Sequence, residues 1–462
     1  GVSIRASDAA DDVLSSTDKS SSAIAKVAAI NASSAQTGVV ATVGNTTVGG
    51  SAMTAASLTG SITINGVATA DFSTSTDAGA SRAMTVAAIN AISDQTGVRA
   101  VDTGDVKKGV VLVADDGRNI EVAFTTLTKA ATGVGAANVY TGTYQLASTT
   151  SSPISIGVSS NGTLSNAGLT AGSYTANVSA MSTVDRAAVA TGGTPLQLNA
   201  GDLRINGTAI VASSTADDTA SDITADSSAK ASSAIAIAAA INKASAQTGV
   251  TATAAANEIV GTSFTAAASG DYTGASMWVN GTTIALDSLE TLGHTATRSD
   301  VASLINQYTG QTGVTATDNG RGLTLVAADG RNVSLGTDVT AANLGVNSAA
   351  INAGATDATE GKTTYARVVM QSDKSFTLEG GSDGNANFEL LGFKTGTYGG
   401  VDNGVKVAQI DISTQAGAQV ALTALDSALK SVSLNQAKLG AFQNRLDAVV
   451  ADRKSTRLNS SH

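Results

Sequence analysis

Residues 242–252 read Asn-Lys-Ala-Ser-Ala-Gln-Thr-Gly-Val-Thr-Ala, and this segment reveals the repeated organisation of the chain. Its second half, Gln-Thr-Gly-Val-x-Ala, occurs four times in the chain, and each time an asparagine stands five residues before the glutamine. The four copies run over 31–41, 90–100, 242–252 and 306–316. Such self-similarity indicates a chain built from repeated structural units.

A short amphipathic helix is predicted before each asparagine. Apolar residues recur there at helical spacing, as at Ile235, Ala238 and Ile241. Serine and aspartate residues in front, such as Ser299 and Asp300, can cap the first helical turn. The glycine of each copy stands where a left-handed residue would end a helix. The signature positions are therefore Asn31, Gly38, Asn90, Gly97, Asn242, Gly249, Asn306 and Gly313.

Tight turns flank these helices on both sides. Asn-Gly pairs at 65–66, 206–207 and 280–281 tolerate the positive φ angles of a type I′ hairpin turn. Asp-Gly-Arg-Asn, at 116–119 and 329–332, is turn chemistry after a strand. Each unit is therefore predicted to be a β-hairpin, a helix and two or three strands. The chain opens with Gly-Val-Ser-Ile, which fits the half of a hairpin after its asparagine, so we expect the first unit to be truncated.

We expect an α+β fold, in which an elongated series of β-hairpin, helix and sheet modules is followed by a long C-terminal α-helix. With 462 residues the chain is too long for one compact unit. The expected boundaries are 1–57 for a truncated first module, 58–132 for the second, 133–200 for a connecting β segment, 201–269 for the third module, 270–340 for the fourth, 341–412 for a β segment that closes the outer domains, 413–451 for the long helix and 452–462 for a tail.

The long helix is predicted from a heptad-like spacing of leucines after Ser413. A helix with this spacing packs on other helices, and the sequence holds no partner for it, which favours an assembly interface over the core of a separate domain. Residues 452–462 can be encoded by a stretch that resembles a sequencing adapter, so we expect them to be an artefact that packs on nothing. The interface candidates are Leu422, Leu425, Leu429, Val432, Leu439, Phe442 and Leu446.

Composition argues against several classes of function. The absence of cysteine removes disulfides, thiolate nucleophiles and cysteine metal ligands. A net charge of −10 has the wrong sign for a protein that coats itself with nucleic acid. No stretch approaches the roughly 20 apolar residues that span a bilayer, so no membrane segment is expected.

Candidate catalytic and metal sites are weak. His294 is the only histidine before the tail and is interpreted as a solvated loop residue. The acidic clusters lack the ligand pattern of an EF-hand loop, and solvated loops are the favoured interpretation over Ca²⁺ sites. No nucleotide-binding motif occurs. We expect no catalytic residue, cofactor or metal. The acidic clusters consist of Asp8, Asp11, Asp12, Asp217, Asp218 and Asp222.

The repeated unit resembles a module of flagellins and flagellar hook-associated proteins. The resemblance rests on Ile-Asn-Gly, a helix ending Ala-Ile-Asn, and Thr-Gly-Val-x-Ala, and it covers most of residues 1–340. Residues 439–445, Leu-Gly-Ala-Phe-Gln-Asn-Arg, are similar to the C-terminal core helix of flagellin. Asn435 to Lys438 depart from the family, which usually has an arginine before the alanine, and this puts one salt bridge in doubt.

The resemblance implies a secreted, non-enzymatic subunit of the extracellular flagellar filament, which serves motility by self-assembly. It would comprise the outer variable domains and part of the polymerisation core. The implied partners are other flagellin copies, hook-associated junction and cap proteins, a secretion chaperone at a missing C-terminus and possible innate immune receptors. Two alternatives stay open: a hook-associated junction or cap protein, and a repeat-built surface adhesin.

Overall fold

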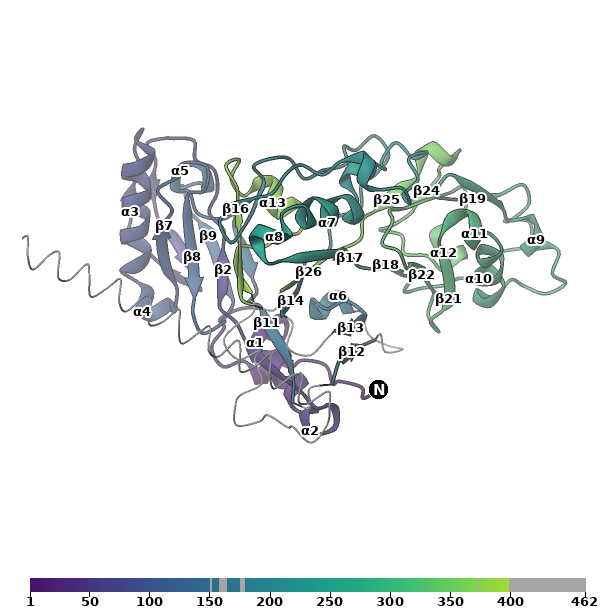
Figure 1. Cartoon of the computed structure of the whole chain (residues 1–462), viewed down its shortest axis with the longest axis horizontal. Coiled ribbons are helices and arrows are strands. Elements are labelled where there is room, and N and C mark those ends of the chain that lie inside the picture. Colours follow the sequence, from purple (N-terminus) through teal and green to yellow (C-terminus); the bar gives the residue numbers. More distant parts are fainter. Residues whose placement is uncertain (150–151, 158–163, 175–178, 373, 399–462) are drawn as a thin grey trace, which may run out of the picture. The chain divides into compact units, whose positions relative to one another are not determined.

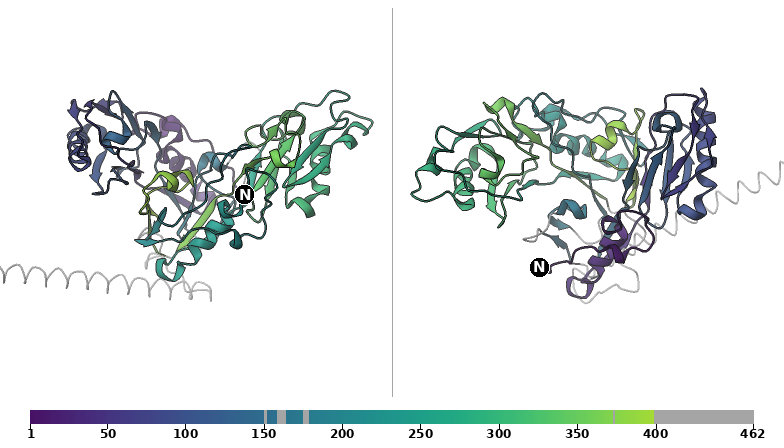
Figure 2. Two further views of the ribbon diagram at one scale, coloured as in Figure 1. Left: turned by 90° about the horizontal axis from the view of Figure 1, so that it is seen from above. Right: turned by 180° about the vertical axis from the view of Figure 1, so that it is seen from behind.

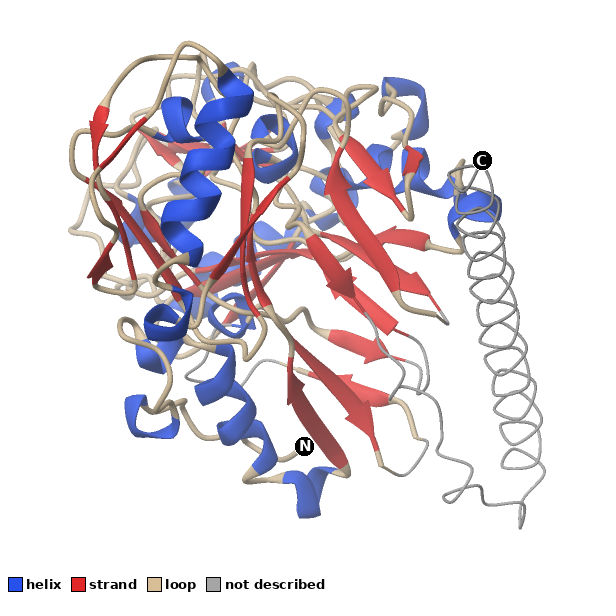
Figure 3. Ribbon diagram, turned by 90° about the vertical axis from the view of Figure 1, so that its left-hand side faces the viewer, coloured by secondary structure: helices blue, strands red, loops and turns tan. Residues whose placement is uncertain are grey.

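The computed structural model contains helices and strands in an α+β arrangement, which confirms that part of the expected fold class (Figures 1 and 3). The expected long helix, all of its interface candidates and the tail lie outside the described residues. The structure describes residues 1–149, 152–157, 164–174, 179–372 and 374–398.

Each copy of the repeat forms the same run of helix, one-turn helix and strand. A helix ends at or next to the asparagine, a one-turn helix follows, and a glycine with positive φ leads into a strand. The one-turn helix between asparagine and glycine is a feature that the periodicity did not reveal. The elements are α1 (Ala23–Asn31), α2 (Ser34–Thr37) and β1 (Val39–Val43); α3 (Ala78–Asn90), α4 (Ser93–Thr96) and β7 (Arg99–Asp102); α7 (Ala234–Asn242), α8 (Ser245–Thr248) and β17 (Thr251–Ala254); and α10 (Arg298–Gln307), α11 (Thr309–Thr312) and β21 (Thr315–Asp318).

Hairpins precede three of the four helices. Their asparagines have φ of 50°, 51° and 47°, and their glycines have φ of 80°, 77° and 77°. Positive φ at both central positions is the requirement of a type I′ turn. The hairpins are β4 (Ile62–Ile64) with β5 (Val67–Ala68), β15 (Leu203–Ile205) with β16 (Thr208–Ala209), and β19 (Ser276–Val279) with β20 (Thr282–Ala285).

The strand pairings interleave the repeats in two nested pairs. β1 pairs with β11 (Tyr144–Ser148), so the second repeat is inserted between two strands that pair around the first. β17 pairs with β26 (Val368–Ser372), and the fourth repeat is inserted in the same way. The next strands, β2 (Thr46–Val48) and β18 (Asn257–Val260), pair with strands of the inserted repeats, β8 (Val110–Ala114) and β22 (Leu323–Ala327).

The two nested pairs also end alike. β27 (Phe376–Gly380), α13 (Ala386–Leu390) and β28 (Gly396–Tyr398) follow the second pair. β12 (Ile154–Ile156), α6 (Leu164–Ala167) and β13 (Gly172–Tyr174) follow the first. Phe376 pairs with Tyr398 as Ile154 pairs with Tyr174, so the register is the same.

The remaining elements are β3 (Thr59–Gly60), β6 (Phe72–Ser73), β9 (Ile120–Phe124), α5 (Lys129–Thr132), β10 (Asn138–Tyr140), β14 (Ser179–Ser182), α9 (Asp287–Glu290), β23 (Val333–Thr337), α12 (Ala341–Leu344), β24 (Asn352–Ala353) and β25 (Lys362–Thr364), with short 3₁₀ turns at Ala9–Asp11, Lys19–Ser21, Thr215–Asp217, Lys230–Ser232 and Ala358–Glu360.

Buried apolar side chains form a core in the second, third and fourth repeats. In the second, α3 packs on β7 and β8, as two directions of view show (Figures 1 and 2). In the third, α7 packs on β17 and β26. Among the described residues, none of these cores includes a side chain of α1, β1, β12 or β13. In the first repeat the buried apolar side chains of the helix and strand are small, and they include Ala25 and Ala29 of α1 and Ala41 of β1.

Candidate functional site

The signature asparagine binds the strand that follows it. Oδ1 of Asn31 accepts a hydrogen bond from the N–H of Ala41 at 2.7 Å, and Nδ2 donates to the C=O of the same residue at 2.9 Å. A carboxamide has a donor and an acceptor side by side, so it can satisfy both groups of one residue as a neighbouring strand would. The same two bonds join Asn90 to Ala100, Asn242 to Ala252, and Asn306 to Ala316.

The signature threonine closes the turn between the one-turn helix and the strand. Oγ1 of Thr96 donates to the C=O of Ile92 at 3.1 Å and accepts from the N–H of Val98 at 3.2 Å. The equivalent bonds occur at Thr37, Thr248 and Thr312. The signature glutamine is exposed in each copy, and nothing in the structure explains it.

The signature glycines have φ of 66°, 69°, 68° and 70°. This is the left-handed region, which residues other than glycine adopt only at a cost in free energy. Two of them also lie against an arginine. A Cβ on Gly97 would stand 2.3 Å from Cζ of Arg118, and one on Gly313 would stand 2.3 Å from Cζ of Arg331. Arg118 donates from Nη1 to the C=O of Thr96, so the turn Asp-Gly-Arg-Asn folds back onto the signature.

The hairpin asparagine has a second role that the Asn-Gly turn motif alone does not predict. Nδ2 of Asn206 donates to the C=O of Thr248 at 2.7 Å, and its Oδ1 accepts from the N–H of Thr377 at 2.9 Å. The hairpin is thereby tied to the signature turn and to a third strand. Asn65 does the same with Thr96 and Glu121, and Asn280 with Thr312 and Ser334. The signal available in the sequence was the recurrence of this asparagine in three repeats.

The interpretation of the acidic clusters as solvated loops is wrong for Asp12 and Asp218, which are each 1% exposed. Oδ1 of Asp12 accepts from the N–H groups of Leu14 and Ser15, and Oγ of Ser15 accepts from the N–H of Asn119 at 2.9 Å. Asp218, Ser221 and Asn332 repeat this arrangement in the second nested pair. Asp12 therefore helps to anchor the first repeat to the Asp-Gly-Arg-Asn turn of the second, and Asp218 helps to anchor the third repeat to the same turn of the fourth.

Burial raises the pKa of Asp12, but the hydroxyls of Ser15 and Ser22 and two backbone N–H groups lower it further, so the net shift in pKa is downward. The pKa of Asp218 is lowered by the same balance, with the hydroxyls of Ser221 and Ser233 as donors. Both carboxylates are thus held ionised by hydrogen bonds inside the fold.

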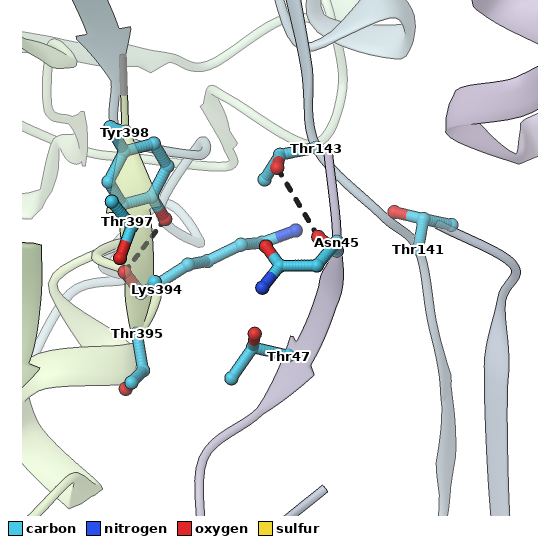
Figure 4. Close-up of a pocket in the computed structure, with 9 residues that line it drawn as sticks. Asn45, Thr47, Thr141, Thr143, Lys394, Thr395, Thr397 and Tyr398 are labelled. Atoms are coloured by element: carbon cyan, nitrogen blue, oxygen red, sulfur yellow. Dashed lines mark hydrogen bonds between the residues drawn. The ribbon is translucent and has the colours of Figure 1, made fainter. Parts of the chain in front are cut away.

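Features of an enzyme or a ligand site are sparse in the described part of the chain. His294 has a side chain that is 56% exposed and lies 3.2 Å from Asp300. Within the described ranges there is no group of three or more acidic or histidine side chains that could hold a metal, and no helix is long and apolar enough to cross a bilayer. A small pocket opens beside Lys394 and Tyr398 (Figure 4). Its volume of about 10 Å³ is near the lower limit for a single water molecule.

Comparison with known proteins places flagellins among the relatives of this chain. No family model matches it. B-type flagellin of Pseudomonas aeruginosa is 32% identical over 200 residues, which are 40% of this chain and 38% of that protein. Polar flagellin A of Vibrio parahaemolyticus is 42% identical over 69 residues, 15% of this chain and 18% of that protein. Flagellin B of Vibrio cholerae is 40% identical over 76 residues, 16% and 17%. The chain spans well under half the length of each relative, and over these segments it is similar to flagellins.

Proposed function

We propose that this chain is a structural, non-enzymatic subunit of a bacterial flagellar filament, located outside the cell and serving motility. The observation that carries the proposal is the 32% identity to B-type flagellin over 200 residues. The geometry supports it, because the hydrogen bonds of the signature residues serve to join helix, turn and strand. Such bonds give rigid modules rather than a reactive site.

The repeats would form the outer domains, and residues 413–451 would form part of the polymerisation core. The leucine-rich face of that segment would contact neighbouring subunits. Contacts of this head-to-tail type do not close on themselves and so propagate a filament. Further proposed partners are junction and cap proteins of the hook, a secretion chaperone and innate immune receptors.

A chimaera tests the filament role. Residues 1–451 would replace the aligned segment of Pseudomonas aeruginosa B-type flagellin, in a strain that lacks its own flagellin. We expect filaments that an antibody against the repeats labels along their whole length in electron micrographs, and restored swimming. A control chimaera carrying L425D, L429D and L439D should be exported but fail to polymerise.

Other outcomes would contradict the proposal in distinct ways. Label confined to the base or tip of filaments would favour a junction or cap protein. Export without incorporation, with label on the cell surface, would favour an adhesin.

A further inference from the structure

The strand that follows each signature glycine lies at the edge of its sheet. In the described part of the chain, β1 pairs only with β11, β7 only with β8, β17 only with β26 and β21 only with β22. An edge strand presents a row of N–H and C=O groups that can pair with a strand of another molecule. Each of the four repeats therefore carries a strand through which copies of the chain can associate.

The backbone groups that face this edge in the third repeat are those of Ala252 and Val250. The N–H and C=O of Ala252 bond to Asn242 and not to Met370, which stands opposite in β26. Because backbone groups in an antiparallel pair alternate between the two sides of a strand, those of Val250 also face away from β26.

The signature side chains occupy these outward groups. Asn242 takes the N–H and the C=O of Ala252 at 2.7 and 2.8 Å, and Oγ1 of Thr248 accepts from the N–H of Val250 at 3.2 Å. The same three bonds occur at the same offsets in the first, second and fourth repeats. The edge is therefore satisfied by side chains of its own repeat.

The sequence of β17 offers no other protection against strand pairing. Residues 251–254 read Thr-Ala-Thr-Ala, without charge or proline, whereas natural edge strands often carry lysine or proline to prevent pairing. The side chains of Thr251 and Thr253 are exposed, and threonine favours the strand conformation. In this strand, protection of the edge rests on the signature side chains.

We infer that the signature asparagine and threonine form an edge guard, which keeps the chain from pairing strand to strand with a second copy of itself. In the third repeat the edge guard consists of Asn242 and Thr248. Without Asn242, the N–H and C=O of Ala252 can bond to the C=O and N–H of Ala252 in a second copy. Such an antiparallel pair of identical strands closes at two molecules. The inference goes beyond the filament role and does not depend on it.

The variant N242A tests the inference on the intact chain. Sedimentation velocity over a range of protein concentrations should show a shift towards a dimer, relative to the unmutated chain. The amide of Ala252 should exchange faster than in the unmutated chain at low concentration and become protected as the concentration rises. An N242A chain that associates no more than the unmutated chain at every concentration would overturn the inference.

Two lysines identify the surface through which N242A associates. In an antiparallel pair centred on Ala252, residue 251 of one copy stands opposite residue 253 of the other. Lysines at both positions place like charges opposite each other, which opposes pairing. N242A carrying T251K and T253K should therefore lose the dimer, although the bonds of Asn242 stay absent. A dimer that persists with the lysines would also overturn the inference.

The variant I241A separates the opening of the edge from a loss of stability. Ile241 is fully buried beside Asn242 in the sequence, so I241A destabilises the same repeat and keeps the asparagine. It should not dimerise. Association of I241A equal to that of N242A would mean that loosening of the repeat drives association, and it would contradict the edge guard.

The fourth repeat keeps the test decisive if circular dichroism shows that N242A does not fold. N306A opens the edge of β21 in the same way, within a repeat that has its own core. I305A is its matched control, because Ile305 is buried and precedes the asparagine as Ile241 does. T315K and T317K are the equivalent lysines. We expect the same pattern of association, and its absence would overturn the inference.

Discussion

Asn242 pairs with Ala252 through both groups of its side-chain amide: Oδ1 accepts from the N–H of Ala252 at 2.7 Å, and Nδ2 donates to its C=O at 2.8 Å. Four asparagines in the chain make this pair of bonds with the residue ten positions later. The bonds close a loop that runs from the end of a helix through a one-turn helix into a strand. They explain why the spacing between asparagine and alanine is the same in each repeat.

Replacing Asn242 by alanine should destabilise the third repeat by about 1–3 kcal/mol, because two backbone groups of Ala252 lose their partners. N242D should also destabilise it, because a carboxylate cannot donate to the C=O. Urea unfolding followed by circular dichroism measures the change. Q247A is the matched control, since the exposed side chain of Gln247 makes no hydrogen bond in the described structure. Equal stability of N242A and Q247A would refute this role.

The signature glycines should differ in their tolerance of alanine. At Gly249, φ is 68° and an added Cβ meets nothing within 4 Å, so G249A pays only the left-handed backbone cost of about 1–2 kcal/mol. At Gly97 the added Cβ also collides with the guanidinium of Arg118, so G97A should cost more. Hydrogen exchange of the strand amides after each glycine measures the local loss of stability. Adding R118A to G97A should recover part of it, and no recovery would argue against the collision.

Acid should weaken the links between the first and second repeats and between the third and fourth repeats. The pKa of Asp12 and the pKa of Asp218 are both lowered by folding, because the effect of hydrogen bonds outweighs that of burial. Their stabilisation is therefore complete above the pKa of an unfolded aspartate, about 3.9, and is lost as the pH falls through the lower folded pKa. D218N should flatten the fall in melting temperature below about pH 4. Q247A, which removes an exposed side chain that does not ionise, should leave the profile unchanged.

Alanine substitutions at equivalent helix positions of the first and third repeats should cost different amounts of unfolding free energy. Ile241 is fully buried in the core of the third repeat, and I241A should cost about 2–5 kcal/mol. Ile30 occupies the same helix position in the first repeat but is half-buried, so I30A should cost less than half as much. Denaturant unfolding of the two variants checks the ratio. A loss at Ile30 as large as that at Ile241 would mean that the first repeat has a complete core after all.

Local residue preferences are enough to predict the helix, the turn and the hairpin of a repeat. The helix before Asn242, the left-handed glycine at Gly249 and the hairpin turn at Asn206 follow from periodicity and from residues with restricted or permissive φ angles. These preferences act over a few residues, so they can be recognised from a single sequence. The α+β class followed from them, whereas the module boundaries stay predictions.

The way in which the repeats combine depends on contacts between distant segments. The pairing of β1 with β11 across an inserted repeat depends on hydrogen bonds between segments about a hundred residues apart, which no local pattern encodes. The burial of Asp218 has the same origin. Asp218 accepts a hydrogen bond from the N–H of Ser221, and Oγ of Ser221 accepts one from the N–H of Asn332, which lies far along the chain. A carboxylate looks solvated in sequence because burial is a property of packing, and packing appears only when distant segments meet.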